Sequence, residues 1–94
     1  MRDYEMMVIL SGELPDDERS AMLDTIQQWV DTAGGAIKNA DHWGRRRMTY
    51  EIGGQRDGYY VVYTLDLPAN VPADLERQMR LNENVLRFLI TRQE

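Results

Sequence analysis

The sequence predicts an α+β fold in which a four-stranded antiparallel sheet carries two helices on one of its faces. Two segments place apolar residues at helical spacing, and four others are extended and rich in apolar side chains. They follow one another as strand, helix, strand, strand, helix, strand. Two β-α-β halves of this kind, joined by right-handed crossovers, give the ferredoxin-like arrangement.

The first strand is expected at Tyr4–Leu10, where nearly every side chain is apolar, so both faces should be covered. A helix of about five turns should follow. Pro15 and the acidic residues 16–18 suit its first turn, and we attribute these acids (Asp16, Asp17 and Glu18) to helix capping. Gly34–Gly35 suits its end. Its apolar stripe comprises Met22, Ile26, Trp29, Val30 and Ala33.

The middle of the chain predicts a β-hairpin. The long extended stretch Ala36–Ile52 contains Gly44, which indicates a bulge or bend. A turn-rich link at residues 53–58 should join it to Tyr59–Leu67, the clearest strand of the sequence.

A short helix and one more strand complete the pattern. The helix is expected from Pro72 to about Leu81, with Leu75 and Met79 on its inner face, and the strand over Val85–Thr91. We expect the 94 residues, 1–94, to form a single domain.

The composition argues against several classes of function. There is no cysteine and only one histidine, His42, so we expect no disulfide, metal or cofactor. No nucleophile motif accompanies that histidine, and we predict neither a catalytic residue nor a small-molecule substrate. The start of the chain lacks a signal-peptide pattern, and no apolar run approaches the roughly 20 residues that span a bilayer. We therefore expect a cytoplasmic protein that has no membrane partner.

Alternation along the strands predicts more apolar sheet surface than two helices can cover. If Met6, Val8 and Leu10 face the helices, their neighbours face away from them. An exposed apolar patch larger than a few hundred Å² usually marks a binding site. The alternative is that scattered exposed apolar residues are normal on any protein. The predicted uncovered set is Met7, Ile9, Tyr60, Val62 and Leu89.

Three consecutive arginines, Arg45, Arg46 and Arg47, stand in a chain whose formal net charge is −5. Residues 1–35 carry a net charge of −6, residues 36–60 of +2 and residues 61–94 of −1. An arginine presents a planar fork of donors that matches a phosphate, so the tract is a candidate RNA contact. The alternative is a solvated run of charge, part of it paired with Asp41, Glu51 or Asp57. On a strand Arg45 and Arg47 share one face, and Arg46 takes the other.

Two aromatic residues are open to more than one interpretation. Trp43 suits packing in the core or hairpin, or a role as an anchor for a partner protein. Tyr60 suits protein contact or stacking on an RNA base, although the first strand offers no second aromatic beside it. We expect His42 to be a surface or hydrogen-bonded residue.

Four segments together resemble a known family. The opening YEMMVIL, the block WGRRRMTYEI, the pair Gly58–Tyr59 and the late LNENVLR resemble, in order and spacing, bacterial small-subunit ribosomal protein six over residues 2 to about 92. Met48 and Thr49 stand where the family usually has leucine and alanine. The sequence ends at Glu94, where many relatives carry a longer charged tail.

The resemblance implies a structural, non-enzymatic protein of the ribosomal small-subunit platform. It would bind the central domain of small-subunit ribosomal RNA as a heterodimer with the basic small-subunit ribosomal protein eighteen, and it would be a monomer when isolated. Two alternatives stay open: an enzyme of the acyl-phosphate hydrolase type, and a homodimeric binding module. The implied RNA contacts are Arg2, Arg45, Arg46, Arg47 and Arg87. The uncovered sheet face and the aromatic residues, rather than the resemblance, give the predicted partner contacts: Met7, Ile9, Trp43, Tyr60, Val62 and Leu89.

Overall fold

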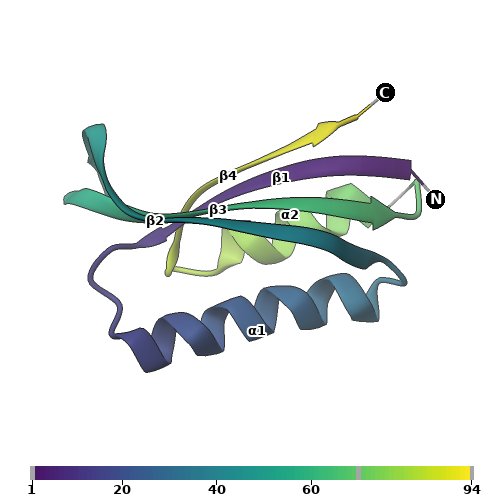
Figure 1. Ribbon diagram of the computed structural model, residues 1–94, viewed down its shortest axis with the longest axis horizontal. Coiled ribbons are helices and arrows are strands. Elements are labelled where there is room, and N and C mark those ends of the chain that lie inside the picture. Colours follow the sequence, from purple (N-terminus) through teal and green to yellow (C-terminus); the bar gives the residue numbers. More distant parts are fainter. Residues whose placement is uncertain (1, 70, 94) are drawn as a thin grey trace.

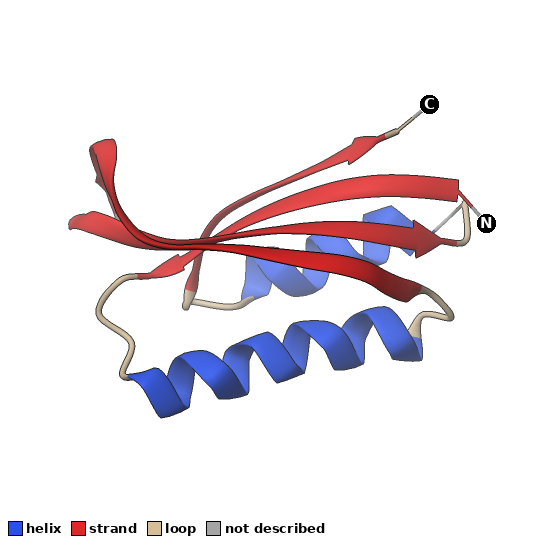
Figure 2. Cartoon of the chain, viewed as in Figure 1, coloured by secondary structure: helices blue, strands red, loops and turns tan. Residues whose placement is uncertain are grey.

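Four strands form one antiparallel sheet, and both helices lie against the same side of it (Figures 1 and 2). The computed structural model describes residues 2–69 and 71–93, so Glu94 lies outside the described residues. The strand order is β2-β3-β1-β4, which confirms the predicted ferredoxin-like fold. The elements are β1 (Arg2–Ser11), α1 (Asp16–Thr32), β2 (Ala36–Ile52), β3 (Gln55–Leu67), α2 (Val71–Leu81) and β4 (Val85–Arg92).

Helix α1 begins and ends where its proline and glycines predict. Pro15 precedes it with φ −58°, and the first turn holds the three acidic residues 16–18. The capping interpretation of these acids is wrong in one respect, because the helix has no side-chain cap hydrogen bond. Asp16 instead accepts a hydrogen bond of 2.7 Å from Arg19, and the acids favour the helix through its dipole. At the other end Gly34 takes φ +84°.

Strand β3 begins at Gln55, four residues earlier than the expected start at Tyr59. Ile52 pairs with Gln55, which leaves Gly53–Gly54 as a two-residue hairpin turn. Both glycines have positive φ, +58° and +78°, the backbone that matches the twist of two hairpin strands. The polar residues 55–57 do not show the alternation typical of a strand. They join the sheet because the tight glycine turn places them beside β2.

The core fills the space between the helices and one face of the sheet. Met6 and Val8 on β1 lie opposite Tyr63 and Val61 on β3, and none of the four is more than 3 % exposed. Burial raises the pKa of Tyr63 to about 12, because the ionised phenolate would be poorly solvated there. The helices contribute mainly Met22, Ile26, Val30, Val71, Leu75 and Met79.

The edge strand β2 has two one-residue bulges and a third, longer irregularity between Arg47 and Ile52, next to the hairpin turn. Its register against β3 shifts between Ile37 and Asn39 and again between His42 and Gly44. Lys38 and Trp43 are therefore the extra residues, and Gly44 supports the second bulge with φ +82°. The bulge expected at Gly44 is confirmed.

The two faces of the sheet should respond differently to the same truncation. Leu65→Ala empties a fully buried site on the helix side and should lower the free energy of unfolding by about 2–5 kcal/mol. Leu89→Ala removes a side chain that is 64 % exposed on the other side and should change it by less than about 0.5 kcal/mol. Urea denaturation followed by circular dichroism measures both. A comparable loss for the two variants would contradict this assignment of the faces.

Candidate functional site

The side of the sheet opposite the helices is apolar at its centre, and we call this side the open face. Strand register places Met7 between Val62 on β3 and Leu89 on β4, and it places Ile9 beside Tyr60. The five residues predicted to be uncovered are therefore neighbours. Four are half-buried among one another and their surroundings, whereas Leu89 is exposed.

Large exposed apolar side chains gather on this side. Four stand out among the described residues: Trp43 at 41 %, Tyr50 at 59 %, Leu89 at 64 % and Leu81 at 76 % exposed. Trp43 and Leu89 lie on the open face, and Tyr50 lies on the hairpin arm that rises over the same side (Figure 1). Only Leu81, at the end of α2, lies elsewhere.

Trp43 forms an aromatic stack on the open face rather than entering the core. Its ring lies 6.3 Å from that of Tyr60 with an interplanar angle of 10°. Its indole Nε1 donates a hydrogen bond of 3.1 Å to Asp41, which fixes the ring's orientation. Strand β1 has no aromatic residue beside Tyr60 on this face. The neighbouring aromatic ring is instead that of Trp43, the extra residue of the bulge in β2. Strand alternation in the sequence does not predict this contact, because the bulge interrupts the alternation at Trp43.

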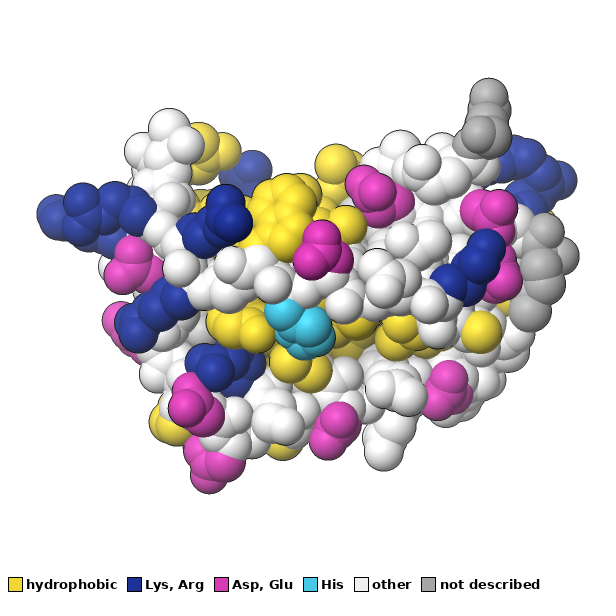
Figure 3. Space-filling view, viewed as in Figure 1, with side chains coloured by type: hydrophobic (Ala, Val, Ile, Leu, Met, Phe, Trp, Pro, Cys, Tyr) yellow, Lys and Arg dark blue, Asp and Glu magenta, His cyan; other side chains and the backbone are white. Residues whose placement is uncertain are grey.

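Arginine side chains gather at the hairpin end of the sheet, and we call Arg45, Arg46, Arg47 and Arg87 the arginine end. In Figure 3, Lys and Arg lie at the left of the view next to apolar surface. The interpretation that the tract pairs with acids is wrong for the described residues: Glu51 binds Arg56 at 3.2 Å, and no ion pair links Arg45, Arg46 or Arg47 to an acid.

Two members of the arginine end lie over aromatic rings. The Arg46 guanidinium carbon is 5.3 Å from the centre of the Trp43 ring, and that of Arg87 is 5.7 Å from the centre of the Tyr50 ring. Both distances fall within the range of cation–π attraction. Arg2 does not belong to this group, since it pairs with Leu67 at the other end of the sheet.

The far end of the open face holds a small charge cluster. Lys38, the first bulge residue, lies 3.3 Å from a carboxylate oxygen of Asp3 and 3.6 Å from one of Asp66. The Asp66 carboxyl, which can donate a hydrogen bond to Asp3 when it is protonated, and then the Lys38 ammonium hold the pKa of Asp3 below its ordinary 3.8. The same carboxylates, Asp3 foremost, raise the pKa of Lys38 above 10.5. The bulge brings together residues that no sequence motif links.

The helix side offers no catalytic arrangement at His42. Its Nδ1 lies 3.2 Å from the Tyr59 hydroxyl, as expected for a hydrogen-bonded histidine, and Arg19 lies over the Tyr59 ring at 4.4 Å. Residues 2–69 and 71–93 contain no group of three or more His, Asp or Glu placed to hold a metal ion. No helix within the same ranges has the length and apolar character needed to cross a membrane.

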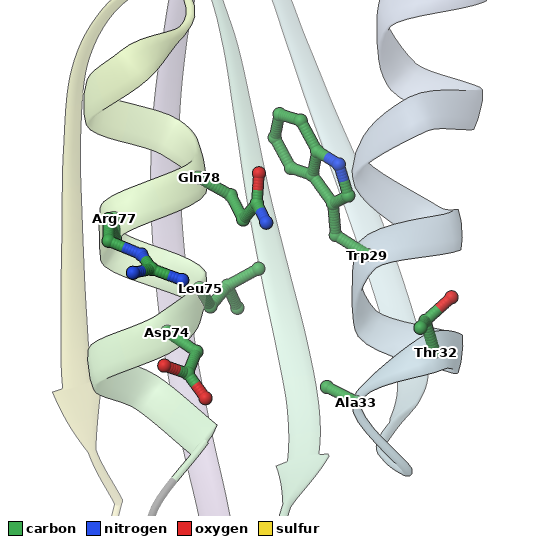
Figure 4. Close-up of a pocket in the computed structure, with 7 residues that line it drawn as sticks. All are labelled: Trp29, Thr32, Ala33, Asp74, Leu75, Arg77 and Gln78. Atoms are coloured by element: carbon green, nitrogen blue, oxygen red, sulfur yellow. The ribbon is translucent and has the colours of Figure 1, made fainter.

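A hollow of about 290 Å³ lies between α1 and α2 (Figure 4). Trp29 of α1 and Gln78 of α2 point toward one another across it. Its polar lining also includes the Thr32 hydroxyl, one carboxylate and one guanidinium, but no imidazole or amine base that would activate the hydroxyl. The hollow is a gap between helices rather than a reaction site. Its full lining is Trp29, Thr32, Ala33, Asp74, Leu75, Arg77 and Gln78.

The fold presents one uncovered sheet face beside an arginine-rich end. The family model described as Ribosomal protein S6 matches residues 3–92, and the chain belongs to this family. It is thus a ribosomal protein of the bacterial small subunit, not an enzyme, and the expected cytoplasmic, ribosomal location follows. This confirms the resemblance found in the sequence.

Two curated relatives match this chain over nearly their whole length. The small ribosomal subunit protein bS6 of Salinispora arenicola is 46 % identical over 94 residues, which span all of this chain and 98 % of the relative. That of Caldanaerobacter subterraneus is 38 % identical, over 98 % of this chain and 97 % of the relative. The crystal structure of 30S ribosomal protein S6 from Thermotoga maritima superimposes with a TM-score of 0.92 at 25 % identity, covering 98 % and 87 % of the two chains.

Removing the lysine from the charge cluster should raise the pKa of Asp3. In Lys38→Met the carboxylate loses both a hydrogen bond and a positive charge. A lowered pKa stabilises the folded state above the unfolded value, and this contribution is lost as pH falls through the folded pKa. The variant should therefore be less stable than the wild type near neutral pH, and the difference should vanish in acid. Carbon-detected NMR of the Asp3 carboxyl follows the titration, with Lys38→Arg as the control. An unchanged Asp3 titration in Lys38→Met would contradict the cluster.

Proposed function

We propose that the chain binds the central domain of small-subunit ribosomal RNA as a heterodimer with small-subunit ribosomal protein eighteen. In this proposal the open face receives the partner protein, and the arginine end contacts RNA. The predicted site residues divide accordingly into Met7, Ile9, Trp43, Tyr60, Val62 and Leu89 for the partner and Arg2, Arg45, Arg46, Arg47 and Arg87 for RNA.

The observation that carries the proposal is the composition of the open face. An apolar centre lies on β1, β3 and β4, and Trp43 is stacked at its margin. Acidic side chains of residues 3, 5, 41 and 66 occupy the same side of the sheet. Asp3 and Asp66 share one lysine, Lys38, so that end of the face keeps a net negative charge that complements a basic protein, and the apolar centre is desolvated on contact.

The charge distribution supports the division of roles. The acidic first third, much of it on α1, repels a polyanion, so RNA contact through α1 itself is disfavoured (Figure 3). The arginine end offers local positive charge, and a basic partner would add to it. Arg2, at the other end of the sheet, can join the same RNA surface only if the RNA or the partner spans the whole face.

Reconstitution from purified components tests the proposal. The isolated chain should be a monomer that binds RNA weakly. An equimolar amount of ribosomal protein eighteen should give a one-to-one complex that binds a central-domain RNA fragment at low salt. Analytical ultracentrifugation and filter binding measure the two steps. A stable homodimer, or tight RNA binding by the chain alone, would overturn the proposal.

Leu89 should matter to the partner although it matters little to the fold. Leu89→Ala removes an exposed leucine of the edge strand β4, beside Met7 on the open face, and should weaken binding to ribosomal protein eighteen about tenfold or more. Leu81→Ala is the matched control, since Leu81 is also largely solvent-exposed but lies at the end of α2. Isothermal titration calorimetry compares them. Equal affinities for the two variants would remove the open face from the interface.

A further inference from the structure

The three consecutive arginines lie on two different sides of the sheet. Arg46 pairs with Gly58, and Gly44 pairs with Tyr60, so Arg46 belongs to the row of side chains on the open face. Arg45 and Arg47 pair with Tyr59 and Asp57, which belong to the opposite row. The contact between Tyr59 and Arg19 of α1 confirms that this opposite row faces the helix side.

Arg46 is engaged within the open face. Its guanidinium lies over the Trp43 ring, and its Nε donates a hydrogen bond of 3.5 Å to the Trp43 carbonyl. Trp43 in turn stacks on Tyr60 and donates to Asp41. The resulting layer of guanidinium, indole and phenol is continuous with the apolar centre of the face. Layers of this composition are enriched at the energetic centres of protein interfaces.

Arg45 and Arg47 are not engaged in this way. Within residues 2–69 and 71–93 neither guanidinium takes part in an ion pair, a side-chain hydrogen bond or a cation–π contact. Both side chains are exposed. Two residues apart on one side of a strand, they lie about 7 Å from each other. They retain their full donor sets for phosphate oxygens.

We propose that the arginine tract is divided between two partners: Arg46 serves the protein interface by holding Trp43 flat on Tyr60, and Arg45 and Arg47 serve RNA phosphates. The inference rests on the proposed function and refines it, because the tract then no longer acts as one RNA site. Arg46 is a positioning residue for the aromatic anchor. Arg87, which lies over Tyr50 from the open face, falls on the protein side of the same division.

Single substitutions distinguish the two roles. Arg45→Ala and Arg47→Ala should each reduce the slope of log affinity against log salt for RNA by about 0.7–0.9, the loss of one phosphate contact. Both should leave the affinity for ribosomal protein eighteen within about twofold. Arg46→Ala should weaken that protein affinity about five- to thirtyfold and leave the RNA salt slope unchanged. RNA binding is measured on the heterodimer at saturating partner, and protein binding is measured without RNA.

Two further variants separate charge from stacking and control for folding. Arg46→Lys keeps the positive charge but not the planar guanidinium, so it should still weaken protein binding and keep the RNA slope. Arg77→Ala on α2 should change neither quantity. In a Trp29→Phe background, acrylamide should quench Trp43 fluorescence more strongly after Arg46→Ala, which reports the freed ring directly.

The division is overturned if Arg46→Ala lowers the RNA salt slope as its neighbours do, or if its protein affinity equals that of Arg45→Ala. If the wild-type chain binds both partners but the three alanine variants do not differ in these two quantities, only the division of the tract is wrong. If the wild-type chain binds neither ribosomal protein eighteen nor RNA, the proposed function fails, and the division fails with it.

Discussion

The number of helices limits what this sheet can bury by itself. Strands β1 and β3 are apolar on both faces, yet α1 and α2 both lie on one side, as two right-handed crossovers require. The helix side becomes a closed core in which Met6, Val8, Leu65 and Met79 have no exposed surface. The open face keeps its apolar centre in contact with water. Burying that surface against a partner therefore contributes free energy that the isolated chain does not gain.

The edge strand β2 adds specific side chains to the apolar open face. Each of its two bulges sends an extra residue across the open face: Lys38 toward two carboxylates at one end, and Trp43 onto Tyr60 near the other. The bulges also interrupt the regular backbone edge, which discourages strand addition by other chains. The centre of the face thus favours apolar contact. One end carries two carboxylates paired with Lys38, and the other end carries arginines that lie over aromatic rings.

The fold and the sidedness of the strands could be predicted from the sequence, because alternation and helical spacing follow from local geometry. Met7, Ile9, Val62 and Leu89 lie where alternation places them. The start of β3 could not be predicted, since Gln55 enters the sheet only through pairing across the glycine turn. The Trp43–Tyr60 stack, the contact of Arg87 with Tyr50 and the Lys38 cluster also escaped prediction. Each depends on a bulge or on a contact between distant segments, which a pattern along one strand does not encode.

The central claim is that the helix-free side of the sheet is the surface that meets the partner protein. Methyl-labelled NMR tests it most directly, since Ile9, Val62 and Leu89 report the open face while Ile26 and Leu75 report the core and helices. Titration with ribosomal protein eighteen should shift or broaden the first set and leave the second nearly unchanged. Perturbations confined to α1 and α2, with the open-face methyls unaffected, would contradict the account.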